Sequence, residues 1–132
     1  MKEKILFTEK PLNKEVILKE LEDLGEKYNY IIVKKDTYKN ADIDFYTDYS
    51  YDYLISFSFT KQKTNEKYSY KKEDRNIQTY MAIQYEVELD EKLNILLKEI
   101  LQKYPEMYVS NDSQQEFYNI ENFNSKVEVA SV

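Results

Sequence analysis

Two segments of this chain alternate between apolar and polar side chains at every second residue, which is the period of a β-strand. Residues 51–59 carry the apolar face Tyr51, Tyr53, Ile55, Phe57 and Phe59, and residues 78–88 carry the inward set Thr79, Met81, Ile83, Tyr85 and Val87. A sheet with one apolar face buries that face against a second layer. We therefore expect the two segments to pair antiparallel and to be covered by helices.

Two helices are predicted from apolar spacings of three and four residues. Asn13 is a favourable N-cap for a first helix, which either ends at Gly25 or continues to about Lys27. Asp90 begins the second helix and Pro105 ends it. The apolar stripes are Ile17, Leu21, Leu24 and Tyr28 in the first helix and Leu93, Leu96, Leu97, Ile100, Leu101 and Tyr104 in the second.

Shorter strands are expected at residues 4–8, 30–34, 107–110 and 116–120. The predicted class is therefore α+β, with the order β-α-β-β-β-α-β. The expected sheet is mainly antiparallel, has four to six strands and carries two helices on one face. This layout resembles a ferredoxin-like fold with an added strand. At 132 residues we expect one domain spanning residues 1–132.

Two segments lack a hydrophobic period. Residues 61–76 carry six basic and three acidic side chains, and we expect an exposed basic loop there, either a hairpin or a mobile excursion. Residues 124–132 show only weak alternation, which is typical of an edge strand or a frayed tail.

The residue inventory removes most familiar catalytic classes. The chain has no histidine and no cysteine, so His-dependent triads, cysteine nucleophiles and the usual zinc ligands are absent. Its single glycine, Gly25, is too few for the glycine-rich loops that bind phosphate. We expect a protein that is not an enzyme and that uses no cofactor.

The formal charge of −6 is unevenly distributed. Residues 40–60 carry four acidic and no basic side chains, and residues 105–132 carry five acidic and one basic. Such a surface repels nucleic acid and anionic membranes, so neither is expected as a partner. Complementary charge favours a partner protein with a basic surface, such as a toxin or a nucleic-acid-processing enzyme.

The segment 42–59 combines these acids with tyrosines, which are enriched at protein interfaces. Its second half has the burial pattern of a strand, whereas its first half lacks one. We therefore expect partner contacts from the first half and from a second patch near the C-terminus. The predicted binding residues are Asp42, Asp44, Tyr46, Asp48, Tyr49 and Asp52, with Glu116 and Tyr118 as the second patch.

Other interpretations of these residues remain open. The tyrosines also suit the edge of a core, and the aspartates suit a solvated loop. The four aspartates at positions 42, 44, 48 and 52 offer oxygen ligands for Mg²⁺ or Ca²⁺, but the glycine and terminal Glu of an EF-hand are missing, so no metal is expected. Glu86 and Glu88 are the best carboxylate pair for a glycosidase-like enzyme, and a Tyr/Phe-lined small-ligand site is a further alternative.

The N-terminal apolar run, residues 5–7, is too short for a signal sequence, and no later segment approaches a membrane span. We expect a cytoplasmic protein, although a mature chain whose signal had been removed would look the same.

In size, acidity and lack of catalytic residues, the chain resembles bacterial immunity proteins, which bind and neutralise a cognate toxin. It is similar in the same general way to small phage-encoded inhibitors of host defence enzymes. The resemblance covers overall character and includes no residue motif. It implies a stoichiometric inhibitor whose acidic surface covers a basic active site or groove, and it leaves the oligomeric state open.

Overall fold

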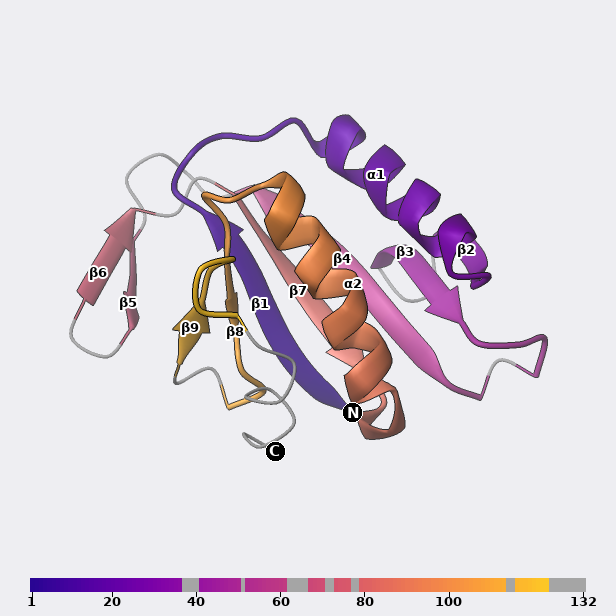
Figure 1. The fold of residues 1–132 in the computed structure, drawn as a ribbon. Coiled ribbons are helices and arrows are strands. Elements are labelled where there is room, and N and C mark those ends of the chain that lie inside the picture. Colours follow the sequence, from indigo (N-terminus) through magenta and orange to yellow (C-terminus); the bar gives the residue numbers. More distant parts are fainter. Residues whose placement is uncertain are drawn as a thin grey trace.

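The structure, a computed structural model, describes residues 1–36, 41–50, 52–61, 67–70, 73–76, 79–113 and 116–123. Within these ranges, seven strands form one antiparallel sheet and two helices lie on one of its faces (Figure 1). The predicted α+β class is confirmed, but the sheet is larger than the four to six strands expected. The elements are β1 (Lys2–Thr8), α1 (Lys14–Lys27), β2 (Ile31–Asp36), β3 (Ala41–Tyr46), β4 (Leu54–Lys61), β5 (Lys67–Tyr70), β6 (Glu73–Asn76), β7 (Thr79–Tyr85), the 3-10 helix η1 (Val87–Leu89), α2 (Asp90–Lys103), β8 (Tyr108–Ser110) and β9 (Phe117–Tyr118).

The sheet has the order β2-β3-β4-β7-β1-β8-β9, and every described pairing in it is antiparallel. Helix α2 links β7 to β8, which lie on either side of β1. This interleaving is the split β-α-β arrangement of ferredoxin-like folds. In this chain, β2 and β3 extend the sheet beyond β4, and β9 extends it beyond β8.

Strand β3 is the principal element that sequence reasoning missed. Its residues Ile43 and Phe45 point toward the helices and are fully buried. The Phe45 ring lies 5.1 Å from Phe57 and 5.3 Å from Tyr30, so the strand is held by aromatic packing in the core. The acidic segment before β4, which was not predicted to be a strand, therefore forms strand β3.

The central pairing of β4 with β7 matches the prediction, and Ile55 lies opposite Tyr85 in the core. The first strand begins later than expected, at Leu54 and not at residue 51, and the second ends earlier, at Tyr85 and not at residue 88. Tyr53 and Val87, which we expected to point inward, are exposed for this reason. Tyr51 lies outside the described residues.

Helix α1 begins as predicted. The Asn13 side chain accepts hydrogen bonds from the backbone N–H groups of Glu15 and Val16, at 2.9 and 3.2 Å. The helix does not end at Gly25. It continues to Lys27, and Asn29 follows in the left-handed region with a φ of 62°.

Helix α2 covers the predicted leucine stripe, but Asp90 is its first helical residue and does not act as a side-chain cap. Asp90 instead lies 4.0 Å from the Nζ of Lys4, an ammonium group that is completely buried beneath the helix. The Lys4 Nζ also lies 5.6 Å from the centre of the Tyr85 ring. The start of α2 is therefore anchored to the sheet by a buried polar contact.

Two predicted surface segments lie partly or wholly outside the described residues. Within 61–76, where we expected an exposed basic loop, β5 and β6 pair with each other in a separate two-stranded sheet. Residues 124–132, where we expected an edge strand or frayed tail, are not among the described residues.

Candidate functional site: an acidic end of the sheet

The structure does not place all the predicted binding residues on one surface. Asp44 is 0% exposed and Tyr46 is also buried, because both belong to β3 in the interior of the sheet. Among the described residues, neither carboxylate oxygen of Asp44 has a hydrogen-bond partner. The expectation that residues 42–46 form an exposed patch is therefore wrong for these two side chains.

Asp42 is also committed to the fold. One of its carboxylate oxygens accepts a hydrogen bond from the backbone N–H of Phe59 at 2.6 Å, and the other lies 3.0 Å from the Nζ of Lys14. These contacts tie the start of β3 to β4 and to helix α1. They indicate a structural role for Asp42.

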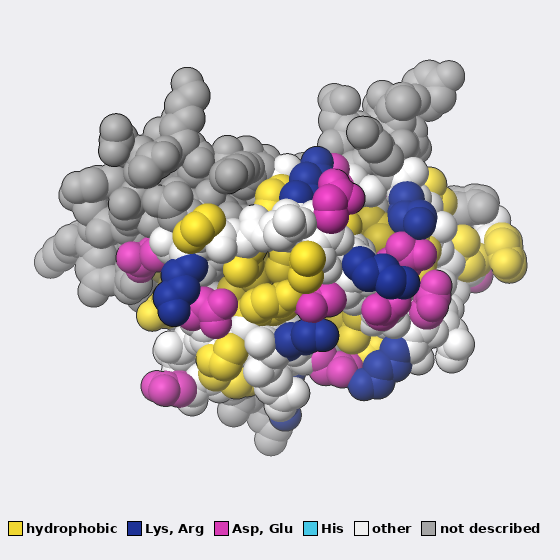
Figure 2. Space-filling model, turned by 90° about the horizontal axis from the view of Figure 1, so that it is seen from above, with side chains coloured by type: hydrophobic (Ala, Val, Ile, Leu, Met, Phe, Trp, Pro, Cys, Tyr) yellow, Lys and Arg dark blue, Asp and Glu magenta, His cyan; other side chains and the backbone are white. Residues whose placement is uncertain are grey.

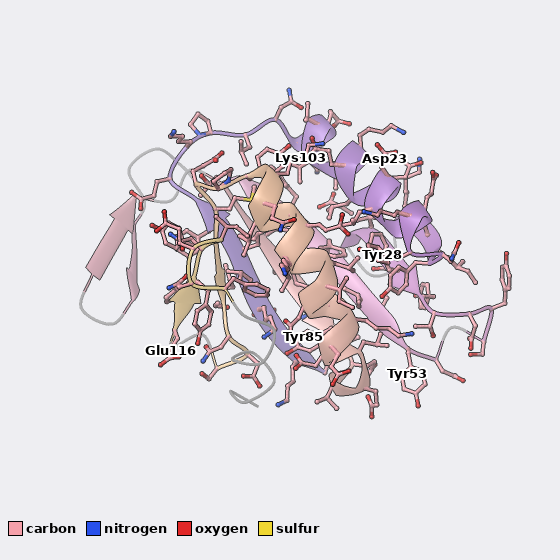
Figure 3. The ribbon with its side chains drawn as sticks, viewed as in Figure 1. Asp23, Tyr28, Tyr53, Tyr85, Lys103 and Glu116 are labelled. Atoms are coloured by element: carbon pink, nitrogen blue, oxygen red, sulfur yellow. The ribbon has the colours of Figure 1, made fainter. Side chains whose placement is uncertain are left out.

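The second predicted patch lies elsewhere. Glu116, beside β9, is on the opposite side of the molecule from Tyr53 (Figure 3). Tyr118 is buried, and its hydroxyl donates a 2.6 Å hydrogen bond to the Glu116 carboxylate. These two residues do not join the first patch.

The exposed remainder of the predicted patch is the loop between β3 and β4. Tyr49 is 80% exposed, and Asp48 and Asp52 are also exposed. Asp48 accepts hydrogen bonds from the hydroxyl and the backbone N–H of Ser50, the latter at 2.9 Å. These bonds lower the pKa of the Asp48 carboxyl and shape the loop, so Asp48 is ionised at neutral pH.

A second acidic segment lies beside this loop. The backbone N–H of Glu86 donates to the carbonyl of Leu54 at 3.2 Å, so the chain leaves β7 next to the point where it enters β4. The short helix η1 and the first turn of α2 then expose further acids and an apolar side chain. We call the combined surface the acidic end, made of Asp48, Tyr49, Asp52, Tyr53, Glu86, Val87, Glu88 and Glu91.

Among the described residues, the carboxylates of the acidic end form no ion pairs, although Lys92 follows Glu91 and lines a shallow pocket together with Thr47. Asp48, Asp52, Glu86, Glu88 and Glu91 form no ion pair with any described residue, and residues 47–53 and 86–91 contain no Lys or Arg. Elsewhere on the described surface, acids such as Asp23, Glu20 and Glu99 are paired with lysines. Five carboxylates without an ion-pair partner among the described residues therefore belong to this end.

Apolar side chains lie among these acids. Tyr49, Tyr53 and Val87 are three of the large hydrophobic side chains that remain exposed in the structure, and Tyr53 projects outward from the end of the sheet (Figure 3). Such side chains provide contact area that loses water on binding, whereas the carboxylates select a cationic partner. The arrangement suits a protein interface.

Sequence reasoning found the loop half of this surface and missed the other half. Glu88 belongs to the second alternating segment and residue 91 to the second predicted helix, so neither was expected to contact a partner. That the end of β7 lies beside the start of β4 depends on the pairing of these two strands. The available signal was the acidic run at residues 86–91, which follows the second alternating segment.

The geometry gives little support to carboxylate catalysis or to metal binding. Glu86 and Glu88, the candidate carboxylate pair, lie on the turn into η1 and not on one strand face. In the described part of the chain, no group of three or more His, Cys, Asp or Glu side chains is placed to hold a metal ion. Neither described helix has the length and apolarity needed to cross a membrane.

Comparisons with protein-family models, with curated proteins and with solved structures found no match to this chain.

Proposed function

We propose that the protein is a non-catalytic inhibitor that binds a basic partner protein through the acidic end, in the manner of an immunity protein that neutralises a cognate toxin. The observation that carries this proposal is the set of five unpaired carboxylates around exposed Tyr49, Tyr53 and Val87.

A partner that binds phosphate groups would offer cations to the acidic end. A cleft that binds phosphate groups presents Lys and Arg side chains, and carboxylates engage these cations through charge-assisted hydrogen bonds. The described acids and tyrosines of the loop between β3 and β4, and Glu88 of η1, are exposed and therefore accessible to such a cleft. Long-range attraction between the two charged surfaces would also accelerate their encounter.

The proposal is tested by affinity capture followed by an activity assay. The wild-type protein is immobilised and proteins from the source cells are captured at about 50 mM and about 200 mM salt, because surface charge is screened more strongly at the higher concentration. The captured protein is then purified, and its catalytic activity is titrated with the wild-type chain. We expect complete inhibition at one molecule of inhibitor per molecule of enzyme.

The decisive variant changes four acids to their amides: Asp48→Asn, Asp52→Asn, Glu88→Gln and Glu91→Gln. A matched control changes four exposed acids elsewhere: Glu9→Gln, Glu15→Gln, Glu26→Gln and Glu121→Gln. Both variants lose the same net charge. We expect the first to lose capture and inhibition and the control to retain both. Equal retention by the two variants would show that the acidic end is not the interface.

An inhibitor of a host defence enzyme, as made by phages, would use the same surface in the same way. The identity of the captured enzyme distinguishes the two cases, since a toxin supports the immunity role and a defence nuclease supports the phage role. A captured protein with no inhibited activity would argue against both.

A further inference from the structure

A hollow lies between the two helices, separate from the acidic end. Helices α1 and α2 lie side by side on the sheet (Figure 1). Their facing side chains line a hollow of about 220 Å³ that is open to solvent on one side. Its floor is apolar and reaches the sheet, with Leu6 and Met81 from the strands, Ile17 and Leu21 from α1 and Met107 after α2. The hollow opens at the molecular surface and its lining is mainly apolar, so it offers space for a ligand with an apolar body.

The mouth of the hollow is bridged by ion pairs between the helices. Lys103 lies 3.2 Å from Glu20, and Lys27 lies 2.6 Å from Glu99. The Glu20 carboxylate also accepts a hydrogen bond from Tyr104. Seen from above, the molecule shows apolar side chains with acidic and basic side chains close around them (Figure 2).

The two charges of each bridge are unequally exposed. The Glu20 and Glu99 side chains are 25% and 29% exposed, whereas those of Lys103 and Lys27 are 63% and 60% exposed. The carboxylates are therefore the inner, more fixed groups, and the lysines are the outer, more solvated ones. Solvent screens ion pairs with such exposed lysines and makes them weak, so a bound cation can replace a lysine at small cost.

We propose that this interhelical groove binds a small organic ammonium ion with an apolar body, such as an alkylamine or an arylalkylamine. The ammonium group would be held by Glu20 or Glu99 at the mouth, and the apolar body would fill the floor. A dry cavity of about 150 Å³ accommodates benzene, so this hollow suits an apolar body of roughly nine non-hydrogen atoms. Met81 and Met107 can adjust to the shape of such a ligand.

The test is isothermal titration calorimetry with three eight-carbon probes: octylammonium chloride, sodium octanoate and 1-octanol. We expect octylammonium to bind with a stoichiometry of one and at least about 10-fold more tightly than octanoate, because the inner charge at the mouth is negative. Tighter binding of octanoate, or no saturable binding of octylammonium, would overturn the proposal.

Two variants locate the bound probe. Leu24→Phe adds bulk at the groove lining, and Leu18→Phe adds the same bulk to a partly buried position of α1 that does not line it. We expect octylammonium binding to be lost in Leu24→Phe and kept in Leu18→Phe, with both melting temperatures recorded to confirm folding. Unchanged binding in a folded Leu24→Phe variant would place the probe elsewhere.

A double variant tests whether Glu20 and Glu99 hold the ammonium group. Glu20→Gln combined with Glu99→Gln should weaken octylammonium binding about 10-fold and leave octanol binding unchanged. The control pair Glu22→Gln and Glu26→Gln lies on α1 away from the groove and should change neither. A double variant that bound octylammonium as tightly as the wild type would contradict the role of these carboxylates.

Discussion

Gly25 shows how one residue fixes the distance between helix and sheet. A Cβ atom at this position would lie 2.9 Å from the Ile32 side chain and 2.9 Å from two ring carbons of Phe45. Because Phe45 is fully buried, its ring cannot move aside easily. The glycine therefore serves close packing within α1, and not the helix ending that its sequence position suggested.

We predict that Gly25→Ala destabilises the protein by up to about 2 kcal/mol. Alanine improves helix propensity by about 1 kcal/mol, but overpacking against Phe45 costs about 1–3 kcal/mol. Urea unfolding followed by circular dichroism measures the difference, with the exposed neighbour Glu26→Ala as the control. A Gly25→Ala variant more stable than the wild type would mean that the contact with Phe45 is not tight.

At the scale of elements, Asn13 decides where α1 begins. Asn13→Ala removes two side-chain hydrogen bonds to backbone N–H groups at the helix start, and we expect a loss of about 1 kcal/mol in the free energy of unfolding. Asn13→Asp keeps an accepting oxygen and should remain close to the wild type in the same urea titration. Equal losses in the two variants would point to a cause other than capping.

The ion pair between Lys27 of α1 and Glu99 of α2 should make the free energy of unfolding depend on pH in the acidic range. Hydrogen bonds from Lys27 and then Tyr28 hold the pKa of the Glu99 carboxyl below its ordinary value of 4.5. A carboxyl with a lowered folded-state pKa stabilises the protein above its unfolded pKa, and this contribution is lost as pH falls through the folded value. Glu99 should therefore contribute at neutral pH and lose its contribution below about pH 4.5.

We predict that Glu99→Gln flattens the fall in unfolding free energy between about pH 5 and pH 3, because glutamine does not titrate. Urea titrations across this range measure the slope, and Glu91→Gln, at an exposed position of the same helix, serves as the control. If the wild type and Glu99→Gln lost stability in parallel, the bridge would play no part in acid sensitivity.

The elements were predictable where a periodic pattern matched a buried face, as in the β4–β7 pair and in both helices. Strand β3 has the same alternation, with Ile43 and Phe45 inward. Because of its aspartates, the segment was predicted to be an exposed acidic surface and not a strand. The complete burial of Lys4 could not be predicted, since it follows from where α2 crosses β1. The end of β7 and the start of β4 come together through strand register, which is a long-range property.

At the scale of the whole molecule, charge is arranged differently on two surfaces. Around the interhelical groove, acids and lysines neutralise one another, whereas the acidic end leaves its carboxylates unpaired. A neutralised rim suits a small ligand that displaces one lysine. An unneutralised surface with exposed tyrosines suits a large cationic partner.

The most direct test of the acidic end is the rate at which the captured partner associates with the wild type and with the four-amide variant. This variant carries Asp48→Asn, Asp52→Asn, Glu88→Gln and Glu91→Gln. Stopped-flow experiments measure both rates at about 20 mM and about 200 mM salt. Electrostatic attraction raises association rates by about 10-fold or more and is screened by salt. We therefore predict that the wild-type rate falls at least about 10-fold as salt rises, and that the variant is slow at both concentrations. Equal rates for the two proteins at low salt would contradict the assignment of the acidic end as the binding surface.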